Sequence, residues 1–234
     1  MNIGDNMKIL ASDFDHTIYF GDNEELNQKN VEAIKKFVAA GNKFCIITGR
    51  NYPSLKKRVD QYKIPYNYLV CEDGAKLFKE DDCFETTYLD KNDAEKVVEY
   101  LQHEKWNFYL DDGYGVIDDF NNCVKIVVDC VDEEEKKEIV DYVRKRVPVH
   151  IYASRRHVNV IEKDVNKKVA LDHLMEHENI NINDIYVIGD NDNDYEMLSS
   201  YQGAIIKKHH KILDDLGKKE YEYFYQYVEE LMEN

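Results

Sequence analysis

The stretch Lys8-Ile9-Leu10-Ala11-Ser12-Asp13-Phe14-Asp15-His16-Thr17 decides the fold, because a short apolar run in it stops at a group of polar residues. A nearly continuous apolar run of this length indicates a strand buried on both faces. The pattern returns in Phe44-Cys45-Ile46-Ile47 and in Tyr68-Leu69-Val70-Cys71, with helical patterns between the runs. We therefore predict strands that alternate with helices in a parallel sheet covered on both faces.

Two helices are predicted between these strands. Asn27 is expected to cap a helix that places Val31 and Ile34 on one face, and Gly41 is expected to end it. A second helix is predicted over 53–61, with proline tolerated in its first turn.

The middle of the chain has a different rhythm. Between about residues 90 and 162, a helix followed by two strands is predicted twice, over 92–104, 106–110 and 123–128, and then over 132–146, 149–153 and 157–161. A helix over 168–178 and a buried strand over 185–188 then resume the first pattern. The fold class predicted is α/β, a Rossmann-like parallel-sheet core with an inserted small α+β module.

Composition excludes several classes of partner. The 234 residues include 31 Lys and Arg against 47 Asp and Glu, a formal net charge of −16. Such a surface repels nucleic acids and anionic membranes, so we expect neither as a partner, whereas a small anionic substrate needs only a few converging cations. No apolar run approaches the roughly 20 residues of a membrane helix, and the first residues lack a signal-peptide pattern. We expect a cytoplasmic protein, and no oligomeric state is predicted.

The cysteines indicate reduced core residues. Their number is odd, no CxxC occurs, and several lie in apolar runs, which favours neither disulfides nor a zinc site. They are Cys45, Cys71, Cys83, Cys123 and Cys130.

Polar residues with chemical potential lie where predicted elements begin or end. In an open α/β sheet, ligands bind at the carboxyl ends of the strands, so these distant segments are expected to meet in one crevice. Each signal alone is weak, because solvated carboxylates and turns are common in so acidic a chain, but their joint occurrence in this order is strong evidence. The segments are Asp13–Thr17, Thr48-Gly49-Arg50, Lys167 and Asp190–Asp194.

The residue types fit phosphoryl chemistry. Asp13, Asp190 and Asp194 would form a hard oxygen cluster suited to Mg²⁺. Because these carboxylates repel one another and a phosphate, a divalent cation is needed to hold them together. Thr48 can donate to a phosphate oxygen, and Lys167 supplies a compact positive charge. Of the pair Asp13 and Asp15, one could be a nucleophile while the other, protonated, donates to a leaving oxygen.

At these residues the sequence resembles the haloacid dehalogenase superfamily of aspartate-nucleophile phosphatases. Asp13-Phe14-Asp15-His16-Thr17 resembles its first motif and Ile47-Thr48-Gly49-Arg50 its second. Lys167-Lys168-Val169-Ala170-Leu171 resembles the third motif, and the segment 189–198 the fourth. The insertion resembles a type IIB cap of Cof-like sugar phosphatases. The resemblance implies a catalytic core over residues 1–82 and 163–234, with the cap over 83–162.

The resemblance also implies roles for single residues. Asp13 would attack phosphorus and form an aspartyl phosphate, while Asp15 would protonate the leaving alcohol and then deprotonate water. Mg²⁺ would be the cofactor, held by Asp13, the backbone carbonyl of Asp15 and Asp190, with assistance from Asp194. The phosphoryl group would be bound by Thr48, Gly49 and Lys167, with Asn193 orienting Lys167 or the phosphate.

The substrate-facing residues depart from the common pattern. His16 stands where family members often have Gly, Asp73 where Cof-like relatives often carry Asn, and Ala204-Ile205-Ile206 follows Gly203 in place of an Asn-Ala segment. We expect specificity to come mainly from the cap. The candidate substrate contacts are Arg50, Asp73, Arg155 and Arg156, with His157 beside the last two.

The function predicted is a Mg²⁺-dependent phosphatase for a small phosphorylated metabolite, a sugar phosphate in the first place. A phosphomutase or phosphotransferase of the same fold would share the first half-reaction. A phospho-aspartate switch, which also uses Asp, Thr and Lys, would need an acidic pair before the phosphorylated Asp and about half this length. A metal–nucleotide-sugar glycosyltransferase would leave Lys167 and the late aspartates without roles.

Overall fold

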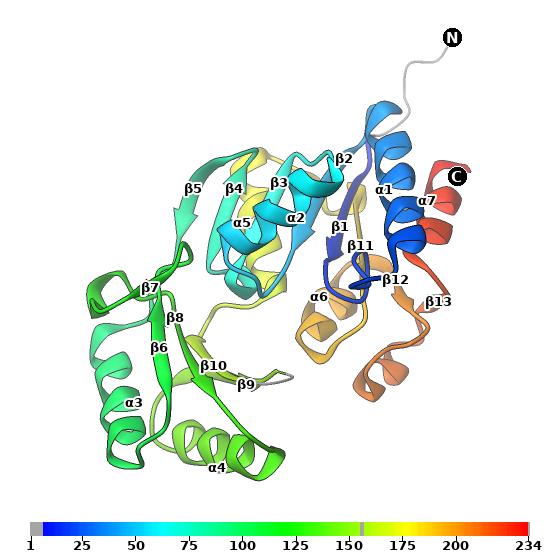
Figure 1. Cartoon of the computed structure of the whole chain (residues 1–234). Helices are drawn as coiled ribbons and strands as arrows, with labels where there is room; N and C mark the ends of the chain where they lie inside the picture. The colour runs from blue at the N-terminus through cyan, green and yellow to red at the C-terminus, as the bar shows by residue number, and fades with distance from the viewer. Residues whose placement is uncertain (1–6, 155–156, 234) are drawn as a thin grey trace.

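The computed structural model describes residues 7–154 and 157–233, which form two β-sheets with helices (Figure 1). The larger sheet has eight strands, and the smaller has five. The chain passes from the larger sheet to the smaller one and returns, so the small sheet is an insertion in the large unit.

The large sheet is parallel at its centre. β1 pairs in parallel with β11 on one side and with β2 on the other, as expected for buried apolar strands. β4 and β5 continue the sheet in antiparallel fashion beyond β3. In spatial order the strands are β13 (Lys219–Tyr221), β12 (Gln202–Ile206), β11 (Ile185–Gly189), β1 (Ile9–Asp13), β2 (Lys43–Ile47), β3 (Tyr68–Cys71), β4 (Lys76–Lys79) and β5 (Asp82–Thr86).

Helices cover both faces of this sheet. One apolar core joins the sheet to α1 (Glu24–Ala39), α2 (Tyr52–Tyr62) and α7 (Phe224–Glu233), and α1 and α7 lie side by side (Figure 1). A second core joins the other face to α5 (Lys167–Glu178) and α6 (Tyr195–Ser200). Alternate residues of β1 enter the two cores, which explains why the strand is apolar throughout.

The small sheet has a different build, with helices on one face. α3 (Lys91–His103) and α4 (Glu133–Arg144) pack on the side away from the large sheet (Figure 1). In β8, Ile126 and Val128 enter this core, so Lys125 and Val127 project from the opposite face. Its strands in spatial order are β7 (Val116–Ile117), β6 (Phe108–Asp111), β8 (Lys125–Asp129), β10 (His157–Glu162) and β9 (Val149–Ala153).

Short 3₁₀ turns join several of these elements. They are η1 (Glu72–Gly74), η2 (Phe120–Asn122), η3 (Ile182–Asp184), η4 (Asp192–Asp194) and η5 (Lys211–Leu216).

The predicted α/β fold class with an inserted α+β module is confirmed, but some local predictions were wrong. Asn23, not Asn27, caps α1: its side chain accepts from Leu26 N, and the helix begins at Glu24. Asn27 is buried inside the helix, where it binds the turn before it through Phe20 N and Gly21 O. Of the cysteines predicted to lie in the core, Cys83 is exposed.

The division into a core over 1–82 and 163–234 and a cap over 83–162 stays a prediction. Strand β5 pairs with β4 of the large sheet, although most of it falls within the range assigned to the cap.

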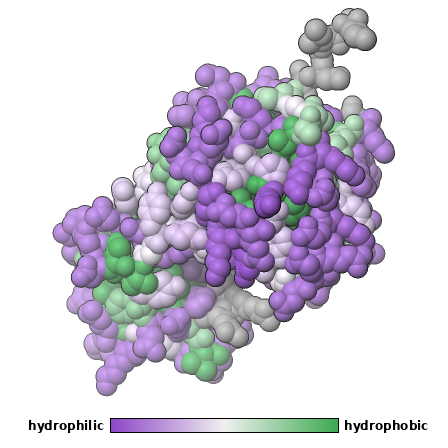
Figure 2. All heavy atoms as spheres, turned by 45° about the horizontal axis from the view of Figure 1, so that its top comes forward, coloured by the Kyte–Doolittle hydropathy of each residue, from purple (hydrophilic) through white to green (hydrophobic). Residues whose placement is uncertain are grey.

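The surface agrees with the acidic composition. The face in Figure 2 is covered mostly by hydrophilic residues, with small apolar groups scattered among them. Among the described residues, no helix combines the length and apolar character needed to cross a membrane.

Candidate active site

The polar segments singled out in the sequence meet at the carboxyl edge of the large sheet. Asp13 ends β1, Thr48 follows β2, and Asp190 follows β11. Because these strands are parallel neighbours, their carboxyl ends lie together, as the sequence predicted. The first turn of α5 brings Lys167 to the same edge.

Lys167 lies at the centre of a buried charge cluster. Its Nζ is 2.6 Å from Asp13 Oδ1 and 2.6 Å from Asp194 Oδ1. The lysine is 1% exposed and Asp194 is fully buried. Burial alone would lower the pKa of Lys167, but the facing carboxylates outweigh it and raise that pKa, so the ammonium is held charged.

Three carboxylates converge beside this lysine. One oxygen of each of Asp13, Asp190 and Asp194 lies within 4.8 Å of the others. Burial, followed by repulsion from Asp194, raises the pKa of Asp190 to about 7, and burial raises the pKa of Asp13 well above its usual range. One lysine therefore does not offset the crowded negative charge, which is the condition that a divalent cation relieves. The hard oxygen donors fit Mg²⁺.

Asp194 and Asp190 differ in how they are held. Asp194 Oδ2 accepts from the backbone N–H groups of Asp190 and Asn191, each at 3.0 Å. Since Asp194 Oδ1 binds Lys167, both of its oxygens have protein partners. Asp190 Oδ1 accepts from Thr17 Oγ1 at 2.8 Å. This arrangement leaves Asp190 better placed than Asp194 to offer an oxygen to a ligand.

The loop after β2 is braced by main-chain hydrogen bonds. Thr48 N donates to Val70 O at 2.9 Å, and Asp73 N donates to Thr48 O at 3.0 Å. A Cβ at Gly49 would lie 2.9 Å from an Asp73 carboxylate oxygen, which explains the glycine at this position. Arg50 N donates to Thr48 Oγ1 at 3.2 Å, which fixes the threonine hydroxyl in this loop.

Arg50 binds Asp15 rather than standing free for a substrate. Its Nε and a terminal nitrogen each donate to one Asp15 oxygen at 2.7 Å, in a bidentate pair. The guanidinium also lies over the rings of Phe14 and Tyr19. Asp15 is therefore near Asp13 in sequence but is engaged with the β2 loop.

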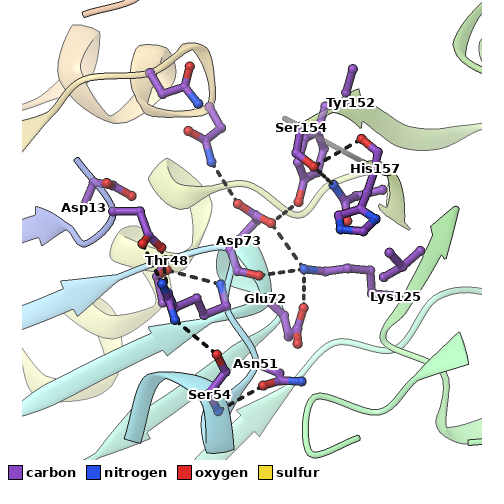
Figure 3. Close-up of a pocket in the computed structure, with 18 of the residues that line it drawn as sticks. Asp13, Thr48, Asn51, Ser54, Glu72, Asp73, Lys125, Tyr152, Ser154 and His157 are labelled. Carbon is purple, nitrogen blue, oxygen red and sulfur yellow. Dashed lines mark hydrogen bonds and ion pairs between the residues drawn. The ribbon is translucent and has the colours of Figure 1, made fainter. Parts of the chain in front are cut away.

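A cavity of about 600 Å³ lies between this edge and the open face of the small sheet. Figure 3 shows Lys125 reaching from the small sheet to Glu72 and Asp73. Lys125 Nζ forms an ion pair with Glu72, lies 3.6 Å from Asp73 Oδ2, and donates to Gly49 O at 2.8 Å. The cavity wall from the small sheet also includes Tyr109, Tyr152, Ser154, His157 and Asn159.

Asp73 joins both sheets. Its carboxylate accepts from the Tyr152 hydroxyl and, at 2.9 Å, from Asn193 Nδ2. Burial alone would raise the pKa of Asp73, but Lys125 and Lys167 outweigh it, and the pKa is lowered. Asn193 was predicted to orient Lys167 or a phosphate, which stays a prediction; its amide donates to Asp73.

The four candidate substrate contacts differ in what the structure shows of them. Arg50 and Asp73 both line the cavity. The Arg50 guanidinium binds the carboxylate of Asp15, and the Asp73 carboxylate accepts hydrogen bonds from Tyr152 and Asn193. Arg155 and Arg156, predicted to contact the substrate, lie outside the described residues.

Sequence reasoning missed the Glu72–Lys125 pair and Tyr152. Glu72 directly follows β3 and precedes the predicted candidate Asp73, so the rule that polar residues at strand ends face the site could have included it. Lys125 opens a strand with no neighbouring motif, and the sequence offers no signal for its partner.

The family follows from comparison with known proteins. A family model described as haloacid dehalogenase-like hydrolase matches residues 10–122 and 114–202. The chain belongs to this family, which confirms the resemblance found in the sequence.

Relatives and solved structures agree with this assignment. An uncharacterized protein of Mycoplasma capricolum subsp. capricolum is 26% identical over 242 residues, covering 86% of this chain and 91% of the relative. A Plasmodium vivax protein assigned to the HAD/COF-like hydrolases superposes with a TM-score of 0.84 at 15% identity, covering 97% and 96% of the two chains. A HAD phosphatase from Bacteroides thetaiotaomicron gives 0.82 at 17% identity, covering 99% and 98%. At these identities, the structures show a shared fold.

Proposed function

We propose that the protein is a Mg²⁺-dependent phosphatase that hydrolyses a small phosphorylated metabolite through an aspartyl phosphate on Asp13. The observation that supports it most is the meeting of Asp13, Thr48, Lys167 and Asp190 at one edge of the sheet, beside a cavity large enough for a small metabolite.

Asp13 is the nucleophile in this proposal. An Asp13 oxygen forms a bond to phosphorus while the bond from phosphorus to the leaving alcohol oxygen breaks. Lys167 neutralises the approaching charges and holds Asp13 Oδ1 in place at 2.6 Å. Thr48 donates its hydroxyl to a transferring oxygen.

Asp15 is the general acid and base. It gives its proton to the leaving oxygen, and later takes a proton from the water that attacks the aspartyl phosphate, which releases phosphate and restores Asp13. Asp15 binds Arg50 through both oxygens, so its carboxyl must turn away from Arg50 to perform this role.

The metal would be held by Asp13, Asp190 and the backbone carbonyl of Asp15. When bound, Mg²⁺ would supply the positive charge that offsets the carboxylates and the phosphoryl oxygens. Asp194 would support this site by holding the residues around it, because one of its oxygens binds Lys167 and the other accepts from the N–H groups of Asp190 and Asn191.

The substrate class proposed is a sugar phosphate. The cavity wall opposite Asp13 offers hydroxyl, amide and imidazole groups, which suit the hydrogen-bonding groups of a polyol. These side chains are Tyr109, Ser154, His157 and Asn159.

The test is a screen of phosphorylated metabolites with Mg²⁺, comparing the wild-type protein with Asp13→Asn. We expect phosphate release that falls by several orders of magnitude in the variant. Asp172→Asn, in the middle of α5, is the matched control and is expected to retain turnover. Retained activity in Asp13→Asn would overturn the nucleophile.

The same screen separates hydrolysis from transfer. Good phosphoryl transfer to a second sugar phosphate, with water a poor acceptor, would instead identify a phosphomutase. A phospho-protein that persists without turnover would identify a switch.

A further inference from the structure

Lys125 belongs to the inserted unit built on the small sheet, which is called the cap from here on. Its side chain reaches the peptide backbone of the proposed phosphate-binding loop, Thr48-Gly49-Arg50. It lies at the start of β8 in the small sheet, and its side chain crosses to the large unit, where Nζ donates to Gly49 O at 2.8 Å (Figure 3). The residue is 5% exposed. Its ammonium also meets Glu72 and Asp73, so the contact is held by two carboxylates as well as by the carbonyl.

The carbonyl that Lys125 binds belongs to a peptide unit with a second fixed end. The N–H of this unit is that of Arg50, and it donates to Thr48 Oγ1 at 3.2 Å. A peptide unit is planar, so fixing the direction of Gly49 C=O also fixes the direction of Arg50 N–H.

This peptide unit controls the orientation of the Thr48 hydroxyl. A hydroxyl has one proton to donate and lone pairs that accept. When Thr48 Oγ1 accepts from Arg50 N–H, its own proton is available to a phosphoryl oxygen. Contacts therefore run continuously from the ammonium of Lys125, through one peptide, to the group proposed to bind phosphate.

The neighbouring carbonyls are held differently. Thr48 O accepts from Asp73 N at 3.0 Å, and Arg50 O accepts from Glu72 N at 3.0 Å. Both donors are main-chain groups of the large unit and do not depend on the small sheet. The Gly49 carbonyl, which lies between them, receives its donor from the cap.

We propose that Lys125 is a positioning residue that couples docking of the cap to the formation of the phosphate-binding loop. The proposal rests on the proposed function only in taking Thr48 as a phosphate ligand. With the cap docked, the Gly49–Arg50 peptide is fixed and Thr48 is oriented to donate. Without the Lys125 contact, the loop keeps its main-chain bonds but loses the constraint on this peptide.

The experiment measures the binding of inorganic phosphate with Mg²⁺ by calorimetry, which needs no turnover. The reference is Glu72→Gln, because removing Lys125 alone would leave Glu72 as an uncompensated buried charge. We expect Lys125→Met in this background to raise the phosphate dissociation constant about tenfold, the size of one hydrogen bond to a charged group. Lys136→Met is the matched control, since Lys136 is also a 5% exposed cap lysine but pairs with Glu133 within α4.

A double-mutant cycle separates positioning from a general structural effect. When Thr48→Val is added to the Glu72→Gln reference, Lys125→Met should change the dissociation constant by less than about twofold, because the group through which it acts is gone. Equal weakening with and without the Thr48 hydroxyl, or no weakening in either background, would overturn the proposal. Thermal unfolding of each variant checks that it is folded.

The outcomes also separate this proposal from the proposed function. Phosphate binding that depends on Lys125 and Thr48 in a protein without phosphatase turnover would retain the inference and overturn the function. Turnover that requires Asp13, together with a phosphate affinity that does not change in the Lys125 variant, would retain the proposed function and overturn this inference.

Discussion

Two buried lysines, Lys167 and Lys125, each lie between two carboxylates, yet they connect different parts of the molecule. Lys167 joins Asp13 and Asp194, and all three belong to the large unit. Lys125 comes from the small sheet and binds Glu72 and Asp73 beyond β3 of the large sheet.

The difference concerns when each charge is removed from water. The cluster around Lys167 forms once the strands of the large sheet and α5 have packed, and it needs no second unit. The cluster around Lys125 forms only when the small sheet docks, so its desolvation cost is part of the docking equilibrium. The first cluster suits a permanent charge arrangement, and the second suits a contact linked to cap position.

The largest effect is expected from Lys167→Met. It leaves Asp13 and Asp194 buried without their cation, so the free energy of unfolding should fall by about 3–5 kcal/mol. Turnover should fall at least about 10²–10³-fold, the usual loss for a group that stabilises developing charge. Chemical denaturation and steady-state kinetics provide the measurements.

The adjacent residue provides the control for that variant. Lys168 pairs with Asp172 on the helix surface, with side chains 37% and 40% exposed. Lys168→Met should therefore cost no more than about 1 kcal/mol. Similar losses of unfolding free energy in Lys167→Met and Lys168→Met would show that the buried Lys167 cluster contributes no more to stability than a surface ion pair.

The large-unit cluster was predictable from sequence, and the reason is topological. Asp13 and Asp190 each follow an apolar run, and parallel neighbouring strands bring such ends together without any knowledge of side-chain packing. Lys167 opens a helix that packs on the same sheet. The order of the elements was therefore enough to place these residues together.

The contacts between the sheets were not predictable in this way. Lys125 is followed by three apolar residues, and a charged residue at a strand end usually reads as solvated. Its burial depends on how the small sheet is oriented over the large one, which no local pattern specifies. The Asn27 error has a related cause, since a buried asparagine within a helix resembles a cap until its distant partners are known.

A middle-sized effect is expected from Glu72→Gln, as a change in the pH dependence of stability. Burial raises the pKa of Glu72 to about 7, against an ordinary value of 4.5, although Lys125 opposes the shift. Between these pH values the folded state binds more protons than the unfolded state, so this group makes stability fall as pH rises. The shift corresponds to a loss of about 3 kcal/mol in the free energy of unfolding, which is fully present above pH 7.

Denaturation of the two proteins at several pH values between 4.5 and 8 isolates this contribution. The pH dependence from Asp190 and the other groups is common to both, and Lys125 stays protonated throughout, so the difference between the curves belongs to Glu72. We expect the variant to gain stability relative to the wild type as pH rises. A constant difference across this range would mean that the Glu72 carboxylate is accommodated without cost in the cap contact.

The smallest effect is expected from Tyr152→Phe, which tests whether every cap contact positions the phosphate loop. The Tyr152 hydroxyl donates to the carboxylate of Asp73, which also accepts from Asn193 and faces Lys125. Removing the hydroxyl should therefore lower the free energy of unfolding by about 1.5 kcal/mol. Phosphate affinity should change less than about twofold, because Tyr152 contacts a side chain and not the Gly49–Arg50 peptide. Tyr109→Phe is the control, since the described residues provide no hydrogen bond to that hydroxyl. A loss of phosphate affinity in Tyr152→Phe as large as that expected for Lys125→Met would show that docking as a whole, and not one lysine, shapes the loop.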